Sequence, residues 1–381
     1  MSGGGLPGGG VLCVLGTRPE AIKFAPVILA LIARGVDVTV CSTGQQRDMT
    51  RAALADFGLV PDIDLDLMLP RQTPEAFVTA ALPGVAAVIA RITPGMVLVQ
   101  GDTATTLAGA LAAAYARVPL GHVEAGLRSH AAEPFPEDFH RRLVAQAATH
   151  HFAPTASARA ALVREGIDWN TIDVTGNPVI DALRLTRAQL ADDADLQARI
   201  IKDLPSLRSG RPLIVVTAHR RENHARMAGI AAAVATLART RDVDIVVPLH
   251  PNPAAGAELR ARLTSLTNVA LIPPLDYLTF VTLLGRARLV LTDSGGIQEE
   301  APAFGCPVLV LRDSTERPEG VEAGVAQLVG TNPAAIVAAA YRLLDDDAAH
   351  AAMADAVMPY GDGHAATRIA AIVADTLAHP R

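Results

Sequence analysis

Three carboxylates stand where short segments of the chain end and a helical pattern begins. Asp102 and Glu124 each follow an apolar run, and Glu137 follows a proline-rich turn. Carboxylates that lie close together raise one another's pKa, which suits them to general acid–base catalysis. Asp102 could instead cap the helix after it, and Glu137 could be a charge that meets a helix dipole. Glu124 has no capping role, so it is the strongest catalytic candidate of the three.

A second candidate site lies in the segment 288–305, RLVLTDSGGIQEEAPAFG. Its pattern predicts a buried strand, a turn through Ser294–Gly296, and a helix from Ile297. Backbone N–H groups at such a turn bind phosphate, because the glycines carry no side chain that would block the anion. Glu299 and Glu300 follow one turn later, where a carboxylate could hold a ribose diol. The alternative is an ordinary strand–loop–helix turn.

His219 is the one histidine whose neighbours point to an anionic ligand. It follows an apolar run directly and precedes Arg220 and Arg221, so the loop is either phosphate-binding or simply basic and solvated. Metal binding is not indicated, because His150 and His151 are adjacent and point apart on a strand. No Gly-x-Gly-x-x-Gly pattern follows the first predicted strand, so a nicotinamide cofactor is not supported either.

The size and composition indicate a protein of two α/β domains. A chain of 381 residues is too long for one ordinary core, and its hydrophobic residues (50%) are mostly Ala, Leu and Val, which is typical of a soluble protein with buried parallel strands. No apolar run reaches the length expected of a membrane span. Residues 1–10 lack a basic segment and a hydrophobic core, so we expect a flexible leader rather than a secretory signal.

The cysteines indicate the redox compartment of the protein, and the net charge indicates which class of ligand it can bind. Three cysteines is an odd number, and Cys13, Cys41 and Cys306 all fall in strand-like apolar runs, so we expect packed thiols in a reducing cytoplasm. With a net charge of −6 and 3% aromatic residues, the chain lacks the basic, aromatic surface that nucleic-acid binding uses. A small phosphorylated ligand fits better.

Strand and helix patterns alternate along both halves of the chain, which predicts parallel sheets. The pattern loosens between Asn177 and Gly210, around an Asp-rich stretch. We therefore expect residues 11–180 and 181–360 to form two Rossmann-like, doubly wound domains, with a helix in 361–381 that crosses back to the first. Ligands bind at the carboxyl ends of such strands and between domains, so the polar clusters should face one central cleft.

Eight motifs in sequence order resemble those of the non-hydrolysing UDP-N-acetylglucosamine 2-epimerases. They are GTRPEAIKFAPVI (16–28), QGDTATT (100–106), GHVEAGLRS (121–129), TGNPVIDAL (175–183), TAHRREN (217–223), LTDSGGIQEEAP (291–302), LRDSTERPEG (311–320) and PYGDG (359–363). Each motif is weak alone, but together they cover nearly the whole chain.

The resemblance implies a GT-B-type fold, a homodimer, and no metal or nicotinamide requirement. Members of the family interconvert UDP-GlcNAc and UDP-ManNAc. The C2 proton is removed as UDP leaves C1, which produces a 2-acetamidoglucal, and UDP then adds back while the opposite face of C2 is protonated. Cations and helix N–H groups that stabilise the departing diphosphate would lower this barrier.

Carried over by motif, the resemblance assigns roles to residues along the chain. The acid–base carboxylates are Asp102, Glu124 and Glu137, with His219 in the catalytic set. The residues that would contact the UDP-sugar are Arg18, Lys23, Arg141, Phe280, Ser294, Gly295, Gly296, Glu300 and Arg317. Phe280 would lie near uracil and Glu300 near the ribose.

Two segments depart from the family pattern. The usual Pro-Glu-Glu-x-Asn-Arg is here Pro-Glu-Asp-Phe-His-Arg at 136–141, in a segment expected to approach the sugar. Bacterial members also bind a second UDP-GlcNAc as an activator, and Gln45, Arg71, Arg220 and His250 match that site. However, the usual Ala-Gln-His-Arg is Gly-Gln-Gln-Arg at 44–47.

Other activities share part of this pattern. A hydrolysing 2-epimerase would release ManNAc and UDP. A GT-B glycosyltransferase would have the same phosphate turn and two sheets but would not need three carboxylates around C2. A non-catalytic sugar-nucleotide sensor would not need them at all.

Overall fold

A computed structural model describes residues 9–129, 135–208, 210–249 and 256–379. The chain forms two compact units, residues 1–185 with 360–381 and residues 186–359. The division between Leu185 and Thr186 falls inside helix α7 (Pro178–Asp192). Most of the expected leader, residues 1–8, lies outside the described residues.

The first unit is built on a seven-stranded sheet in the order β3-β2-β1-β4-β5-β6-β7, and every neighbouring pair is parallel. The strands are β1 Val11–Leu15, β2 Val38–Ser42, β3 Ile63–Asp64, β4 Met96–Gln100, β5 Leu120–Val123, β6 His150–Ala153 and β7 Ile172–Val174. All residues of β1 and β4 are buried, as expected for strands covered by helices on both faces.

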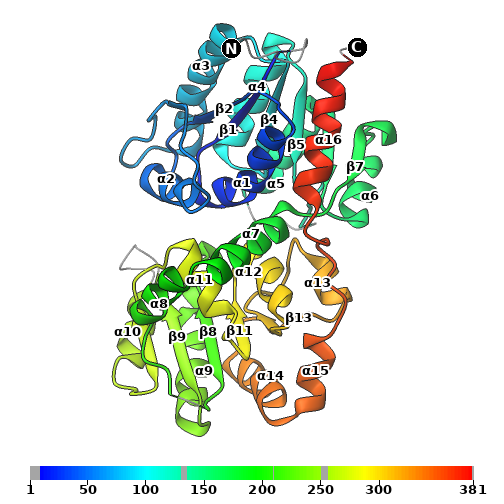
Figure 1. The fold of residues 1–381 in the computed structure, drawn as a ribbon. Coiled ribbons are helices and arrows are strands. Elements are labelled where there is room, and N and C mark those ends of the chain that lie inside the picture. The colour runs from blue at the N-terminus through cyan, green and yellow to red at the C-terminus, as the bar shows by residue number, and fades with distance from the viewer. Residues whose placement is uncertain (1–8, 130–134, 209, 250–255, 380–381) are drawn as a thin grey trace. The chain divides into compact units, whose positions relative to one another are not determined.

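Helices of the first unit pack in two groups, in which α1 contacts α2 and α16, and α4 contacts α3 and α5 (Figure 1). Their bounds are α1 Arg18–Ala33, α2 Arg47–Ala55, α3 Pro74–Ile92, α4 Ala104–Ala116, α5 Glu137–Ala147, α6 Ala156–Arg164 and α16 Ala365–Ala378, with a 3-10 turn at Trp169–Thr171. The last helix, α16, therefore belongs to the first unit although the chain reaches it from the second.

The second unit has a six-stranded parallel sheet in the order β10-β9-β8-β11-β12-β13. The strands are β8 Leu213–Thr217, β9 Asp244–Pro248, β10 Val269–Ile272, β11 Leu289–Thr292, β12 Val308–Val310 and β13 Ala326–Leu328. The helices are α8 Ala194–Asp203, α9 Met227–Thr240, α10 Ala257–Leu263, α11 Tyr277–Leu284, α12 Gly295–Glu300, α13 Pro318–Glu322, α14 Pro333–Asp345 and α15 Asp347–Ala354, with 3-10 turns at Arg221–Arg226 and Ala301–Phe304.

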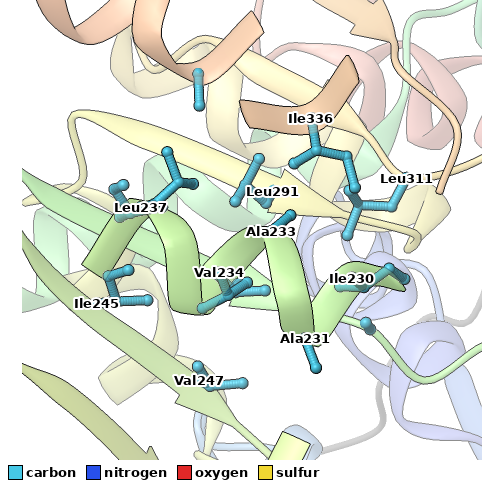
Figure 2. Close-up of a cluster of buried hydrophobic side chains, with 14 of the residues drawn as sticks. Ile230, Ala231, Ala233, Val234, Leu237, Ile245, Val247, Leu291, Leu311 and Ile336 are labelled. Atoms are coloured by element: carbon cyan, nitrogen blue, oxygen red, sulfur yellow. The ribbon is translucent and has the colours of Figure 1, made fainter. Parts of the chain in front are cut away.

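The main core of the second unit lies between α9 and the sheet (Figure 2). Ile230, Val234 and Leu237 of α9 are fully buried, at the spacing that places them on one face of a helix. They pack in the same cluster as Leu291 of β11 and Ile336 of α14. This core fixes the position from which the polar loops after β8 and β11 extend.

The prediction of two doubly wound α/β units is confirmed by the two sheet orders. Several local expectations were wrong. The Asp-rich stretch forms helix α8, which Asp193 caps through the Leu196 N–H. The helix after the Ser-Gly-Gly turn begins at Gly295 rather than Ile297, and Cys306 precedes β12 instead of lying in it, although all three thiols are buried.

Helix α3 corrects the expectation that no apolar run is long enough to span a membrane. Its 19 residues pass that test by length and composition, with a mean hydropathy of 1.6. In this structure Phe77 and Ala81 of α3 pack with α4, and Val85 and Ile89 belong to the core cluster beside the sheet. Only one face of α3 is buried, through Phe77, Ala81, Val85, Val88 and Ile89.

Candidate active site

Both sheets reverse their strand order at the same relative place, between β1 and β4 in the first unit and between β8 and β11 in the second. At such a switch point the loops after the strands diverge and leave a crevice at their carboxyl ends. In the first unit, Gln100 at the end of β4 pairs in register with Val123 at the end of β5. Asp102 and Glu124 therefore follow neighbouring strand ends.

Glu124 is buried and bound on several sides. Its carboxylate pairs with the Lys23 ammonium, accepts from the Gln100 side-chain amide, and accepts from Asn177 Nδ2 at 3.1 Å. Its backbone φ is +65°, a left-handed conformation that is uncommon for glutamate and costs about 1 kcal/mol or more. Such strain persists only where the surroundings hold it, and it is concentrated at functional sites.

Asp102 and Glu137 are linked through the first turns of α5. The Asp102 Oδ2 atom pairs with Arg141 Nη2 at 2.5 Å, and the Arg141 side chain is buried. Glu137 is the first residue of α5, and its Oε2 atom is buried without a hydrogen-bond partner among the described residues. Helix α4 is capped by Thr103, so Asp102 does not have the capping role that its position allowed. A Cβ placed on Gly101 would lie 3.6 Å from Glu124 Oε2, which puts that carboxylate beside the Asp102 turn.

A fourth carboxylate, that of Glu20, lies in the first turn of α1 and binds backbone N–H groups at the N-terminus of this helix. It accepts from the Gly16 and Thr17 N–H groups at 2.9 and 2.8 Å and from the Thr103 and Thr106 hydroxyls at 2.6 and 2.9 Å. Burial raises the pKa of Glu20, and these hydrogen bonds oppose the rise. Helix α1 follows β1 at the switch point of the first sheet, and its N-terminus is therefore occupied by a carboxylate of the protein itself.

In the second unit, Asp293 organises the loop that carries His219. Its Oδ2 atom accepts from the His219 and Arg220 N–H groups, each at 2.9 Å, and from Asn223 Nδ2 at 3.0 Å. The His219 ring lies nearby, with Nδ1 3.5 Å from Asp293 Oδ1, and its side chain is 41% exposed. Asp293 thus fixes the backbone after β8 while the imidazole remains accessible.

The two glycines after β11 differ in their surroundings. A Cβ on Gly296 would have no atom within 4 Å, whereas a Cβ on Gly295 would lie 2.7 Å from Arg317 Nη1 and 2.9 Å from Glu316 Oε1. Ser294 is the N-cap residue, and its own N–H bonds to Thr292 Oγ1 at 3.0 Å. Gly296 therefore leaves open space over the first turn of α12, and Gly295 makes room for a buried arginine.

That arginine belongs to a buried cluster centred on Glu316. Glu316 accepts from Arg220 Nη2 at 3.0 Å, Arg312 Nη1 at 2.7 Å and Arg317 Nη1 at 2.7 Å. Arg317 also binds Glu299 Oε1 at 2.8 Å. Burial lowers the pKa of Arg312, but the neighbouring glutamates overcome this and leave it above its usual value. The cluster holds three guanidinium groups in place without leaving their charge uncompensated.

The remaining substrate-binding candidates lie on the elements where the sequence placed them. Arg18 begins α1, and its N–H bonds to Gln46 Oε1 at 3.0 Å. Phe280 of α11 packs on the core of the second unit, and Glu300 at the end of α12 is buried.

The four candidates for an activator site have unlike environments. Gln45 Oε1 accepts from the Thr105 N–H and hydroxyl at 3.3 and 2.8 Å. Arg71 is exposed, with φ +62°, and Arg220 is bound to Glu316. His250 lies outside the described residues.

Sequence reasoning missed the residues that support the candidates. Gln100 and Asn177 hold Glu124, Asp293 holds the His219 loop, and Glu316 holds Arg317. All four residues stand in recognised motifs, but Gln100, Asn177 and Asp293 contact partners in different motifs, while Glu316 contacts its own neighbour Arg317 as well as the distant Arg220. Over the described ranges, no group of three or more His, Cys, Asp or Glu residues has the arrangement of a metal site.

Comparison with known proteins identifies relatives over nearly the full length. The family model for UDP-N-acetylglucosamine 2-epimerase matches residues 30–374. The UDP-N-acetylglucosamine 2-epimerase of Escherichia coli (strain K12) is 46% identical over 363 residues, which is 94% of this chain and 96% of that protein.

Solved structures agree with this match. The UDP-GlcNAc 2-epimerase from Neisseria meningitidis, bound to UDP-GlcNAc, has a TM-score of 0.93 and 41% identity, and the match covers 96% of this chain and 99% of that chain. The Methanocaldococcus jannaschii enzyme, in complex with UDP-GlcNAc and UDP, has a TM-score of 0.86 and 33% identity, with 95% and 99% covered.

Proposed function

The chain belongs to the UDP-N-acetylglucosamine 2-epimerase family, and on this premise we propose that it interconverts UDP-GlcNAc and UDP-ManNAc without releasing free sugar. The observation that carries the proposal is the environment of Glu124. A buried carboxylate in a strained backbone conformation, paired with Lys23 and beside the Asp102 turn, is suited to acid–base chemistry.

In this proposal the second unit holds the nucleotide. The diphosphate binds at Ser294, Gly295 and Gly296, where Gly296 leaves the first turn of α12 open. His219 and Arg317 supply donors to the charge that grows as UDP leaves. Glu316 supports this role because it fixes the Arg317 guanidinium in advance, so that little reorganisation is needed during the reaction. Glu300 binds the ribose and Phe280 lies near the uracil.

In the first unit, the carboxylates act on the sugar. The C2 proton is not acidic, so its removal must be coupled to the departure of UDP from C1. One of Asp102, Glu124 and Glu137 takes this proton, and a carboxyl group on the other side of the 2-acetamidoglucal delivers a proton to the opposite face. Lys23 and Arg141 hold two of these carboxylates in place, which supports their use as positioned acids and bases. Arg18 adds a cation at the start of α1.

The test is to incubate the protein with UDP-GlcNAc alone and to separate the products by chromatography. We expect UDP-ManNAc in equilibrium with UDP-GlcNAc. Free ManNAc with stoichiometric UDP would instead identify a hydrolysing 2-epimerase. An unchanged substrate would contradict both activities and leave a glycosyltransferase or a non-catalytic sensor.

The carboxylate assignment has its own test. Asp102→Asn, Glu124→Gln and Glu137→Gln should each lower kcat by about 10²–10⁴-fold, because general acid or base catalysis is removed. UDP binding, measured by calorimetry, should change far less. Retained turnover in all three variants would refute the assignment.

We also propose that a second UDP-GlcNAc activates the reverse reaction through Gln45, Arg71, Arg220 and His250. Gln45 and Arg220 already have protein partners, so the activator would have to exchange or add to those contacts. A rate from UDP-ManNAc that does not respond to added UDP-GlcNAc would contradict this. The homodimer is carried over from the family resemblance alone, and the cytoplasmic setting is proposed from the free thiols of Cys13, Cys41 and Cys306.

A further inference from the structure

The loop that carries Asp102 is held by two histidines. His122 Nε2 lies 2.8 Å from the Gly101 carbonyl oxygen, and His140 Nδ1 lies 2.8 Å from the Asp102 carbonyl oxygen. A carbonyl can only accept, so each of these ring nitrogens carries its hydrogen and donates it. Both histidines are buried, at 0% and 5% relative exposure. Two successive carbonyls of one short turn are therefore bound by two imidazoles from different elements.

The His140 contact differs from the His122 contact because of its neighbour in sequence. Arg141, the next residue of α5, binds the Asp102 carboxylate at 2.5 Å, while His140 binds the carbonyl of the same residue. Two adjacent residues of α5 thus hold Asp102, His140 by the Asp102 backbone and Arg141 by the Asp102 side chain. The same helix begins with Glu137, so the relative position of two candidate acid–base groups depends on this contact.

Helix α5 is itself anchored at its outer side. Arg142 binds Asp138 at 3.0 Å and Glu165 at 2.5 Å, and Arg128 binds Glu165 through two nitrogens at 2.9 and 2.6 Å. Arg128 and Arg142 overcome the effect of burial and lower the pKa of Glu165, which keeps it ionised as their partner. The helix is therefore a fixed platform from which His140 and Arg141 reach the Asp102 turn.

The geometry points to His140 as a positioning residue for Asp102, which acts through its Nδ1–H on the Asp102 carbonyl and not on the substrate. The inference rests on the proposed epimerase function. It also explains how histidine can stand where the family pattern has asparagine. His Nδ1 and Asn Nδ2 lie the same number of bonds from Cα, so either side chain can present an N–H group to this carbonyl.

Asparagine and leucine have nearly the same shape, but only asparagine has an N–H group. The variants His140→Leu and His140→Asn therefore isolate the effect of the hydrogen-bond donor at this position. His140→Leu removes the N–H group, and a misplaced catalytic group should lower kcat by roughly 10–100-fold, with KM and the UDP Kd unchanged. His140→Asn should restore most of the wild-type kcat. His350→Leu is the matched control, because His350 also donates to a backbone carbonyl, that of Arg288 at 2.9 Å, in the second unit. This control should lose stability at most, without loss of kcat in the folded enzyme.

A double-mutant cycle distinguishes positioning from a general structural role. If His140 acts through Asp102, His140→Leu should cost little further activity in an Asp102→Asn background. Additive losses, or equal activity of His140→Leu and wild type, would overturn the inference while the proposed function stands. If His140→Leu does not fold, His140→Asp takes its place, since it keeps the shape and cannot donate when ionised. A wild-type protein without epimerase activity would overturn the proposed function and the inference together.

Discussion

Gly296 offers a substitution that should separate ligand binding from folding. A Cβ at this position would meet no protein atom within 4 Å, and Gly296 lies in the first turn of α12. Alanine is favoured over glycine in a helix by up to about 1 kcal/mol. Gly296→Ala should therefore leave the melting temperature unchanged or slightly higher.

The same methyl group should interfere with a diphosphate bound at this turn. The loss of one hydrogen bond to a charged group costs about 1.5–3 kcal/mol. This corresponds to roughly 10–100-fold weaker binding of UDP, which isothermal titration calorimetry can measure. Wild-type affinity for UDP in a folded Gly296→Ala protein would refute the placement of the diphosphate.

Gly295→Ala is the matched comparison because its methyl group points into the protein. The added Cβ would lie 2.7 Å from Arg317 Nη1 and 2.9 Å from Glu316 Oε1. Overpacking of this kind typically costs about 1–3 kcal/mol, so here we expect a lower melting temperature. Equal stability of the two variants would contradict the finding that a Cβ has open space at Gly296 and close protein neighbours at Gly295.

Two further predictions concern stability. Burial lowers the pKa of His122 from its usual 6.5 to about 4, so between these values the unfolded chain binds a proton that the folded chain excludes. The free energy of unfolding should therefore decrease as the pH falls from 6.5 towards 4, by up to about 1.4 kcal/mol per pH unit. His122→Gln should make this pH dependence weaker, which urea titrations at several pH values can measure. Gln Nε2 lies as many bonds from Cα as His Nε2, so the bond to Gly101 can be kept. An unchanged pH slope would contradict the buried neutral imidazole. In the second unit, Leu237→Ala should cost about 2–5 kcal/mol by denaturant unfolding, because this side chain is fully buried in the core shown in Figure 2. A loss below 1 kcal/mol, on the order of a single methylene group, would show that the site is less tightly packed.

The parallel sheets were predictable because their signal is local. Buried strands read as apolar runs, and the polar residues that follow them, such as Glu124 and His219, mark the carboxyl ends where loops begin. Helix α8 was missed because aspartates that look like a loop include the N-cap residue Asp193. A capping residue and a loop residue have the same chemical character, and only the hydrogen bond to the helix distinguishes them.

The supporting contacts of the site could not be derived from spacing. Asn177 reaches Glu124 across 53 positions, and His140 reaches Asp102 across 38. No periodicity connects residues on different strands and helices, because their proximity is created only when the sheet forms. Glu316 illustrates the same limit through Arg220, which it binds across 96 positions.

The most direct test of the account is to incubate UDP-GlcNAc with the protein in D₂O and to examine the recovered nucleotide sugars by NMR and mass spectrometry. Removal and replacement of the C2 proton predicts one deuterium at C2 of UDP-ManNAc and of the UDP-GlcNAc that returns from it. The Glu124→Gln protein should show little incorporation over the same time. Epimerised UDP-sugar without deuterium at C2, or recovered UDP-GlcNAc that remains unlabelled and unchanged, would contradict the account.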